Sequence, residues 1–383
     1  MLNLERVEEA IQRATQRPEL DDTALLLWLR REFDPSIASQ AVQQIHLRHR
    51  AKQKFSRAEQ MWFTPEGLEQ SSSEIVATYH ASRFPEKELV VDAGCGIGGD
   101  LIALGGRGET VGVERDALSI HFAKRNTEVY AVESCCHLIH ADLLRLRLEE
   151  APFLFIDPAR RAEHRRWSSP DKWQPDWATV CRLAKSVQGA LVKTTPALPM
   201  SYIPPDAERE YISVDRECRE LLLAFGECRQ GRSNSALILP EKARLTSAGS
   251  PAPPIHTPMD WIYDPDPAVV AAHLLPELAQ VLGGYLLHPQ IAYLTSANLI
   301  PTPFARAYRV LEHFAYSRKR LFERLRALKA GSITVKKRGV AVEPEQLTRA
   351  WKPAGDRAVT VLMYRTDSGV TAVLAEDTGF ANS

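Results

Sequence analysis

The stretch VVDAGCGIGGD, residues 90–100, decides the fold class of this chain. Two valines lead into an acid, and glycines follow at positions 94, 96, 98 and 99. A ligand can approach the backbone closely where side chains are absent, and a helix beginning after such a turn offers unpaired N–H groups. We therefore predict a buried strand, a turn and a helix that bind a nucleotide, in preference to a plain tight turn. The glycine spacing fits two nucleotide-binding patterns, so the rest of the chain must decide between them.

The bulk composition is that of an ordinary globular protein. The 383 residues suit two or three domains, and the chain is 44% hydrophobic and 25% charged. Basic and acidic residues number 48 each, so the net charge indicates no class of partner. The six cysteines include no C-x-x-C pair, which argues against a zinc site and against a disulfide framework. We expect no metal, reduced thiols and a cytoplasmic location, because the sequence contains no signal peptide or membrane-spanning run.

Three regions follow from the patterning. Residues 1–84 place apolar residues at three- and four-residue spacing and are expected to be helical. In residues 85–246, short apolar runs alternate with helix-like segments, which predicts βαβ units and a parallel sheet. YISVDR, ECRELLLAF and SALILP are expected to complete that sheet with an antiparallel part. A Pro-, Ser- and Ala-rich linker at 241–258 leads into an α+β region, 255–383, in which 304–330 has helical spacing.

Acidic residues stand where the predicted strands end. Asp92 ends the first strand, Glu114 the second, Asp142 the third and Asp157 the fourth. Because the carboxyl ends of parallel strands open onto one crevice, these side chains are expected to meet a common ligand. Glu114 stands where an acid accepts hydrogen bonds from ribose hydroxyls, and Asp142 can accept from an adenine amine. The alternatives are a surface carboxylate at Glu114, a helix N-cap at Asp142 and a turn residue at Asp157.

The fourth strand ends in FIDPARR, residues 155–161. Asp157 and Pro158 place a carboxylate and a rigid, donor-free backbone at the mouth of the crevice. Such a pair can hold an amine while its lone pair attacks an electrophilic methyl group. We predict that Asp157 accepts a hydrogen bond from the target N–H during an in-line methyl transfer, in which positioning contributes about 7–11 kcal/mol.

In this order and spacing, DAGCGIGGD, GVERD, HADLL and FIDPARR resemble the motifs of class I S-adenosylmethionine-dependent methyltransferases, over residues 60–240. FTPEGLEQSSSEIVATYH is similar to the segment that precedes the fold in trimethylguanosine-synthase-like RNA methyltransferases. The resemblance implies a Rossmann-like α/β sheet of seven strands with S-adenosyl-L-methionine as cofactor, and Gly99 as a packing residue. The cofactor-binding residues that it implies are Thr64, Pro65, Asp92, Gly94, Cys95, Gly96, Gly98, Glu114, Arg115, Asp142 and Asp157.

One motif departs from the family pattern. Relatives that methylate exocyclic amines carry Asp/Asn-Pro-Pro and an aromatic residue that stacks on the base, whereas this chain has DPAR at 157–160. The string also resembles uridine C5-methyltransferases, but LVKTTPALP, residues 191–199, lacks the cysteine nucleophile of that route. Phe63, Trp167 and Trp173 are candidate stacking residues, and packed core or rim is the alternative for each.

Basic residues cluster although the chain is neutral. Residues 304–338 hold eleven lysines and arginines against two acids. Together with DWIYDPDPAVV and IAYLTS, this region resembles the THUMP-like domain of a family of bacterial proteins, and THUMP domains proper bind RNA. We predict tRNA or rRNA as the partner, since phosphate binding needs such patches. The predicted contacts are Arg160, Arg161, Arg318, Lys319, Arg320, Lys336, Lys337 and Arg338. Alternatively, Tyr308, Leu311 and Phe314 form the core face of a helix whose basic side is merely solvated.

Three other functions compete with RNA methylation. A small-molecule methyltransferase would use its basic face for solubility alone. A non-catalytic RNA-binding protein has no need of the intact set Asp92, Glu114 and Asp142. A nicotinamide dehydrogenase has little use for Asp157 and Pro158 at a strand tip. The sequence leaves the methylated atom and the oligomeric state open.

Overall fold

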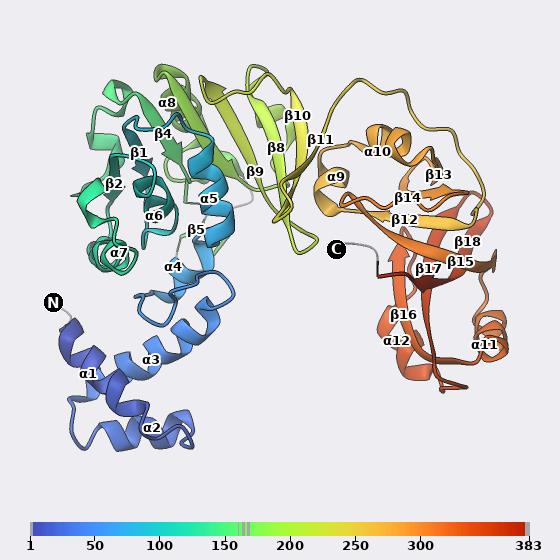
Figure 1. Ribbon diagram of the computed structural model, residues 1–383, viewed down its shortest axis with the longest axis horizontal. Helices are drawn as coiled ribbons and strands as arrows, with labels where there is room; N and C mark the ends of the chain where they lie inside the picture. The colour runs from blue at the N-terminus through green and yellow to red at the C-terminus, as the bar shows by residue number, and fades with distance from the viewer. Residues whose placement is uncertain (1–2, 160, 163–164, 167–168, 380–383) are drawn as a thin grey trace. The chain divides into compact units, whose positions relative to one another are not determined.

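The computed structural model (Figure 1) describes residues 3–159, 161–162, 165–166 and 169–379. Side chains are not described between residues 160 and 168. The chain divides into two compact units. Unit 1 comprises residues 1–194, 201–206 and 223–230, and unit 2 comprises residues 195–200, 207–222 and 231–383.

Residues 3–84 contain five helices, as their apolar spacing predicts. Their bounds are α1 (Leu4–Ala14), α2 (Asp22–Leu29), α3 (Pro35–Ala51), α4 (Pro65–Gln70) and α5 (Glu74–Ser82). Asp21 caps α2 by accepting a hydrogen bond from the Ala24 backbone N–H. Buried side chains of α1, α2 and α3 share one hydrophobic core with Ile97 and Phe122. The helical region therefore packs against the segment that contains the glycine loop.

A parallel sheet forms the centre of unit 1. Its strands are β1 (Val90–Ala93), β2 (Thr110–Glu114), β3 (Cys136–His140), β4 (Phe153–Ile156) and β7 (Gly189–Thr194), in the order β3-β2-β1-β4-β7. Every pairing among them is parallel, and β1, β4 and β7 are wholly buried. The helices between them are α6 (Gly99–Gly105), α7 (Ala117–Val129) and α8 (Trp177–Ser186). The strand order reverses at β1 and β4, where open α/β sheets bind ligands.

The strand order continues from β7 through β9 (Glu217–Gly226), β8 (Glu208–Val214), β10 (Asn234–Leu239) and β11 (Ala243–Thr246). Leaving out the separate hairpin of β5 (Arg161–Ala162) and β6 (Arg165–Arg166), the first seven strands have the order 3-2-1-4-5-7-6. Two strands more than the seven predicted are present. YISVDR, ECRELLLAF and SALILP are strands as predicted and correspond to β8, β9 and β10; β10 pairs parallel with β8 and antiparallel with β11.

A second sheet lies within unit 2, in the order β13-β14-β12-β15-β18-β17-β16. Its elements are β12 (Trp261–Pro265), α9 (Pro267–Ala271), α10 (Leu275–Leu282), β13 (Tyr285–His288), β14 (Ile291–Ser296), β15 (Ala305–Ala315), α11 (Arg318–Ala327), β16 (Ala330–Arg338), α12 (Pro344–Ala350), β17 (Arg357–Thr366) and β18 (Gly369–Asp377). Buried side chains form separate cores on its two faces, and α11 and α12 contribute to one of them. The segments SITVKKRG, AVTVLMYR and VTAVLAE correspond to β16, β17 and β18.

The helix predicted across residues 304–330 is wrong in its first half. Strand β15 occupies residues 305–315, and only α11 is helical. The register of β15 against β18 shifts between Val310 and Glu312, so one extra residue interrupts the two-residue alternation. Tyr308 consequently packs in one core and Phe314 in the core on the opposite face. This extra residue is the reason that Tyr308, Leu311 and Phe314 show the three-residue spacing typical of a helix.

All six cysteines are free thiols. Within the described ranges, none of the helices combines the length and apolar composition that crossing a membrane requires. The same residues contain no group of three His, Cys, Asp or Glu side chains that could hold a metal ion.

Candidate active site

The glycine loop joins β1 to α6 at the point where the strand order reverses. Gly94, Gly96 and Gly98 have φ angles of +108°, +54° and +92°, which glycine adopts without strain. A Cβ added to Gly96 would meet nothing within 4 Å, so this part of the backbone is open to a ligand. A Cβ added to Gly99 would lie 3.1 Å from the Cβ of Ser71. Gly99 therefore permits close packing, as the sequence predicted.

Glu114 ties the glycine loop to the end of β2. Its Oε2 accepts a hydrogen bond from the Gly96 backbone N–H at 3.0 Å. Its Oε1 accepts from the backbone N–H groups of Arg115 and Asp116, each at 2.8 Å. A carboxylate oxygen has two lone pairs, so Oε2 can accept a further hydrogen bond from a ligand hydroxyl. Glu114 shapes the loop and can also contact what the loop binds.

Two other predicted cofactor residues have structural roles, and a third is exposed. The Cys95 thiol packs with Leu101 in a small core, and burial raises its pKa. Asp142 is exposed and caps a short helical turn by accepting from the Leu144 N–H, which was the alternative interpretation. The Arg115 side chain is exposed at the end of β2.

Two buried carboxylates differ sharply in their surroundings. Asp100 in α6 accepts hydrogen bonds from Ser72 Oγ at 2.7 Å and shares one with His80 Nδ1 at 2.8 Å. Burial raises the pKa of Asp100, but the hydrogen bond and charge of His80 outweigh it and hold that pKa low. Asp92 is 1% exposed, and its Oδ2 has no hydrogen-bond partner among the described residues. Burial, followed by the charges of Asp100 and two further acids, raises the pKa of Asp92 well above its usual value.

Asp157 lies beside the glycine loop, directly after β4. Its carbonyl oxygen is 3.6 Å from where a Cβ on Gly94 would stand. The Nζ of Lys193 in β7 donates to Asp157 Oδ2 at 2.6 Å and to the Gln70 carbonyl at 3.3 Å. Pro158 is buried at the same strand tip. Sequence reasoning missed Lys193, although a charged residue inside an apolar strand was a visible signal.

The segment before α4 is anchored to the glycine loop. Asn126 Nδ2 donates to the carbonyls of Trp62 and Ile97, both at 2.9 Å, and its Oδ1 accepts from the Trp62 N–H at 2.8 Å. Thr64 caps α4 by accepting from the Gly67 N–H, with Pro65 in the first turn. These contacts place Thr64 and Pro65 next to the loop.

Two of the three candidate stacking residues, Phe63 and Trp173, are buried. Phe63 is 1% exposed in the helical core, and Trp173 packs edge-on against Trp177. Trp167 and Arg160 lie outside the described residues, and the side chain of Arg161 in β5 is not described.

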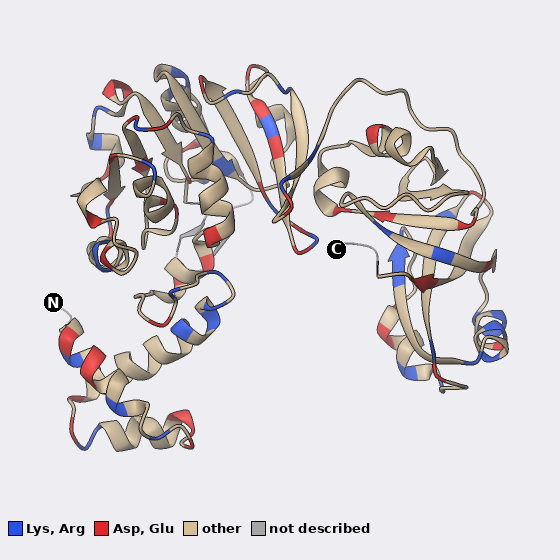
Figure 2. Ribbon diagram, in the orientation of Figure 1, with Lys and Arg blue, Asp and Glu red and all other residues tan. Residues whose placement is uncertain are grey.

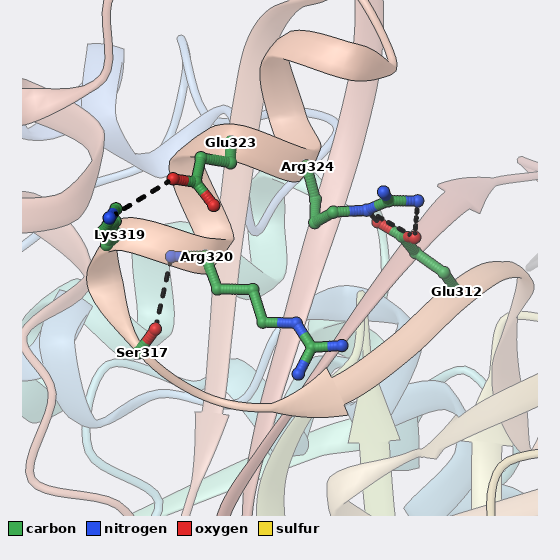
Figure 3. Close-up of a pocket in the computed structure, with 6 residues that line it drawn as sticks. All are labelled: Glu312, Ser317, Lys319, Arg320, Glu323 and Arg324. Carbon is green, nitrogen blue, oxygen red and sulfur yellow. Dashed lines mark hydrogen bonds and ion pairs between the residues drawn. The ribbon is translucent and has the colours of Figure 1, made fainter.

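The remaining predicted RNA-binding residues all belong to unit 2, on α11 and β16 (Figure 2). Figure 3 shows the depression beside α11, where Lys319 lies near Glu323 and Arg324 is paired with Glu312. Arg318 and Arg320 lie over the rings of Phe322 and Phe314. The residues of β16 are held differently: Lys336 and Arg338 contact Asp264, whereas Lys337 pairs with Glu343.

The strand order, the glycine loop and the acids at the strand ends define the class of S-adenosylmethionine-dependent methyltransferases. Residues 87–188 match the family described as RNA cap guanine-N2 methyltransferase, and residues 305–377 match the THUMP domain-like family. A crystal structure of a methyltransferase from Porphyromonas gingivalis shares the fold with a TM-score of 0.81 at 19% identity, over 99% of this chain and 100% of that one.

Relatives found by sequence comparison show the family to which the chain belongs. In two strains of Mycobacterium tuberculosis, a protein named an uncharacterized S-adenosylmethionine-dependent methyltransferase is 31% identical over 315 residues, which cover 81% of this chain and 86% of that protein. The chain belongs to the S-adenosylmethionine-dependent methyltransferases. The site fits that cofactor, because the unpartnered Asp92 oxygen suits a buried positive group and the open backbone at Gly96 leaves room for it.

Proposed function

We propose that this enzyme transfers a methyl group in line to a nitrogen of a base in structured RNA, either tRNA or rRNA. The observation that carries the proposal is Asp157, a carboxylate beside the glycine loop whose Oδ2 is held by Lys193. Among the described residues nothing is hydrogen-bonded to its Oδ1, so that atom can accept from a target N–H. The matches of residues 87–188 and 305–377 to RNA-methyltransferase and THUMP-like families support RNA as the substrate class.

The cofactor supplies an electrophilic methyl group, and the residues around the loop bind and orient it. In this proposal Asp92 contacts the ammonium group, and the glycine loop lets the amino-acid end approach the backbone. Glu114 accepts from the ribose hydroxyls, and Asp142 accepts from the adenine amine at the rim. Thr64 and Pro65 lie along the same crevice.

Asp157 directs the nucleophile. A hydrogen bond from the target N–H to Asp157 Oδ1 aims the nitrogen lone pair at the methyl group. The ion pair with Lys193 holds the Asp157 carboxylate in place to accept that hydrogen bond. The proton becomes acidic only as the new N–C bond forms, so a strong base is not required. Positioning of this kind can supply about 7–11 kcal/mol of the barrier.

The test uses Asp157→Ala and, as a matched control, Asp206→Ala, which removes an exposed aspartate paired with Lys185 in the same unit. Labelled methyl transfer is measured into total RNA and into a metabolite extract, both from a deletion strain, and cofactor binding is measured by calorimetry. We expect Asp157→Ala to lose at least about a hundredfold in rate and much less in cofactor affinity, with Asp206→Ala unchanged in both.

A second variant, Lys193→Met, keeps the length of the side chain but removes the charge that holds Asp157. It should lower the rate while changing cofactor affinity less. Wild-type rates in Asp157→Ala would disprove the role of Asp157, and label that enters metabolites alone would disprove the RNA substrate.

A further inference from the structure

The sheet of unit 2 curls so that distant strands approach each other. Three strands separate β12 from β16 in the sheet order. Nevertheless Lys336 Nζ and Arg338 Nη2 of β16 each lie 2.8 Å from the carboxylate of Asp264 in β12. A Cβ on Gly339, just after β16, would stand 2.9 Å from Cδ1 of Ile291 in β14. The edge strand β16 therefore faces β12 and β14 across the inside of the curl.

The alternation of β16 divides its basic run between the two faces of the sheet. In the parallel register, Lys336 lies beside Leu362 and Arg338 beside Tyr364, and both partners belong to the core inside the curl. Lys337 lies beside Met363, which belongs to the core on the other face, and it pairs with Glu343 at 3.1 Å. Two of the three basic residues thus point inward, and the one between them does not.

A third cation joins the inward pair. The Nη2 of Arg216, in the turn between β8 and β9, donates to the Asp264 carbonyl at 2.9 Å and lies 3.9 Å from the Asp264 carboxylate. Asp215 and Arg216 both have positive φ, the conformation of a tight two-residue hairpin turn, which fixes where the arginine points. Asp264, Arg216, Lys336 and Arg338 are called the Asp264 cluster below.

The Asp264 cluster carries more positive charge than its carboxylate requires. The Asp264 side chain is 9% exposed, whereas the three cations are 23–32% exposed and so present their remaining donors to solvent. The next acid along the chain, Asp266, is fully buried, caps α9 with its Oδ1 and is near enough to interact electrostatically with Arg216, so two acids face three cations. One counter-charge would compensate Asp264, and three cations around it repel one another. A bound anion would relieve that repulsion.

The floor of the cluster is aromatic. Arg338 lies 5.0 Å from the centroid of the Tyr293 ring, and Lys336 lies 5.6 Å from that of Tyr308. These rings hold the two cations in place, and two guanidinium groups with one ammonium match the oxygens of a phosphate. By contrast, the basic residues of α11 that line the depression in Figure 3 share it with Glu312 and Glu323, which pair with Arg324 and Lys319, so their charge there is largely compensated.

We propose that the Asp264 cluster is a phosphate-binding site for the RNA substrate, formed by Arg216, Lys336 and Arg338. The inference rests on the proposed function, because that function supplies the RNA whose backbone phosphates would bind here. It separates the basic run of β16 into two residues that bind RNA and one that does not. Lys337 is therefore an internal control with the same charge, on the same strand, one residue away.

The experiment compares Lys336→Gln and Arg338→Gln with Lys337→Gln in the full-length protein. Affinity for unfractionated tRNA and rRNA is measured at several salt concentrations, and thermal denaturation with and without inorganic phosphate is measured in parallel, against chloride at equal ionic strength. We expect the two inward variants to lose roughly tenfold or more in affinity. Their salt-dependence slope should fall by about 0.7–0.9 for each lost phosphate contact. Phosphate should raise the melting temperature of wild type and Lys337→Gln, but raise it less in the inward variants.

Equal losses in all three variants, or losses in none, would overturn the site. If an inward variant does not fold, Arg216→Gln replaces it, because that side chain approaches from the hairpin and not from the sheet. If wild type binds no RNA, the proposed function fails while the site is still judged by its response to inorganic phosphate. If phosphate then stabilises the wild type but not Lys336→Gln, the Asp264 cluster is still a phosphate-binding site, with a phosphate source other than RNA. If phosphate does not raise the melting temperature of the wild type, the cluster is not a phosphate-binding site.

Discussion

Asp92 is the carboxylate of the site with the least support from its neighbours. It is fully buried and its Oδ2 lacks a hydrogen-bond partner among the described residues, whereas Asp100 close by has two. Burial raises the pKa of Asp92, which means that the folded protein without ligand holds the charged form at a cost. A buried positive ligand group would recover that cost on binding. Under the proposed function, the buried charge of Asp92 lowers the stability of the ligand-free enzyme and raises its affinity for the cofactor.

One substitution at Asp92 should therefore change the stability and the cofactor affinity in opposite directions. Asp92→Asn should stabilise the ligand-free enzyme by about 1–3 kcal/mol at neutral pH, and should weaken cofactor binding by roughly tenfold or more. Because the folded pKa of Asp92 is raised, Asp92 should make the free energy of unfolding of the wild type fall as pH rises from about 4. The asparagine variant should not show this pH-dependent fall. Urea denaturation and calorimetry at several pH values measure both effects.

Asp100→Asn serves as the control. Asp100 has its hydrogen bonds and its pKa is lowered, so this substitution should destabilise the protein. Destabilisation by Asp92→Asn as well would show that Asp92 has a supporting partner in the folded state.

At the scale of elements, the contact between the upstream segment and the glycine loop depends on α3 and α7. Gln44 of α3 exchanges two hydrogen bonds with the backbone of Phe63, and Asn126 of α7 does the same with Trp62. Only Asn126 also bonds to the loop, at the Ile97 carbonyl. Asn126 therefore couples the position of the upstream segment to the shape of the cofactor loop.

Asn126→Ala should destabilise the enzyme by about 2–4 kcal/mol, because three buried hydrogen bonds are lost, and should also weaken cofactor binding. Gln44→Ala should destabilise the protein but change cofactor affinity less, since Gln44 does not contact the loop. Denaturation and calorimetry on both variants check the difference. Unchanged cofactor affinity in a destabilised Asn126→Ala enzyme would contradict the coupling.

At the scale of the whole molecule, both units contain carboxylates whose pKa is lowered by basic partners. In unit 1, burial raises the pKa of Asp100, but His80 more than offsets it. In unit 2, burial likewise raises the pKa of Asp264, but Arg338 and Lys336 more than offset it. A carboxylate with a lowered folded pKa contributes stability that is present above its unfolded pKa and is lost as pH falls through the folded value.

Acid should therefore weaken both units together. The contributions of Asp100 and Asp264 to the free energy of unfolding should be lost as pH drops below about 4, whereas those of Asp92 and Asp266, whose folded pKa values are raised by burial, should make stability fall as pH rises above that value. Hydrogen exchange from pH 6 to pH 3, corrected for intrinsic exchange rates, resolves the two units separately. Protection that persists in unit 2 at pH 3 would show that the ion pairs of Asp264 add nothing to stability.

Local features of the sequence predicted the cofactor part of the site. A strand, a glycine turn and the start of a helix depend on neighbouring residues, so VVDAGCGIGGD specified its own conformation. The acids at the ends of β1, β2 and β4 followed from the alternation of strands and helices. For the same reason, the cap at Asp142 could be named in advance as the alternative to adenine binding.

Only the tertiary structure decided which distant side chains meet. Lys193 and Asp157 are 36 residues apart, and Lys336 and Asp264 are 72 apart, so each pair depends on the strand order and on the curl of a sheet. The bulge in β15 gave a strand the spacing of a helix, and only its pairing with β18 distinguishes the two. The sequence by itself determined the strand, the glycine turn and the helix start at residues 90–100, because these elements fold on local rules. The lysine that holds Asp157 and the cations around Asp264 were decided by contacts between strands that no local pattern specifies.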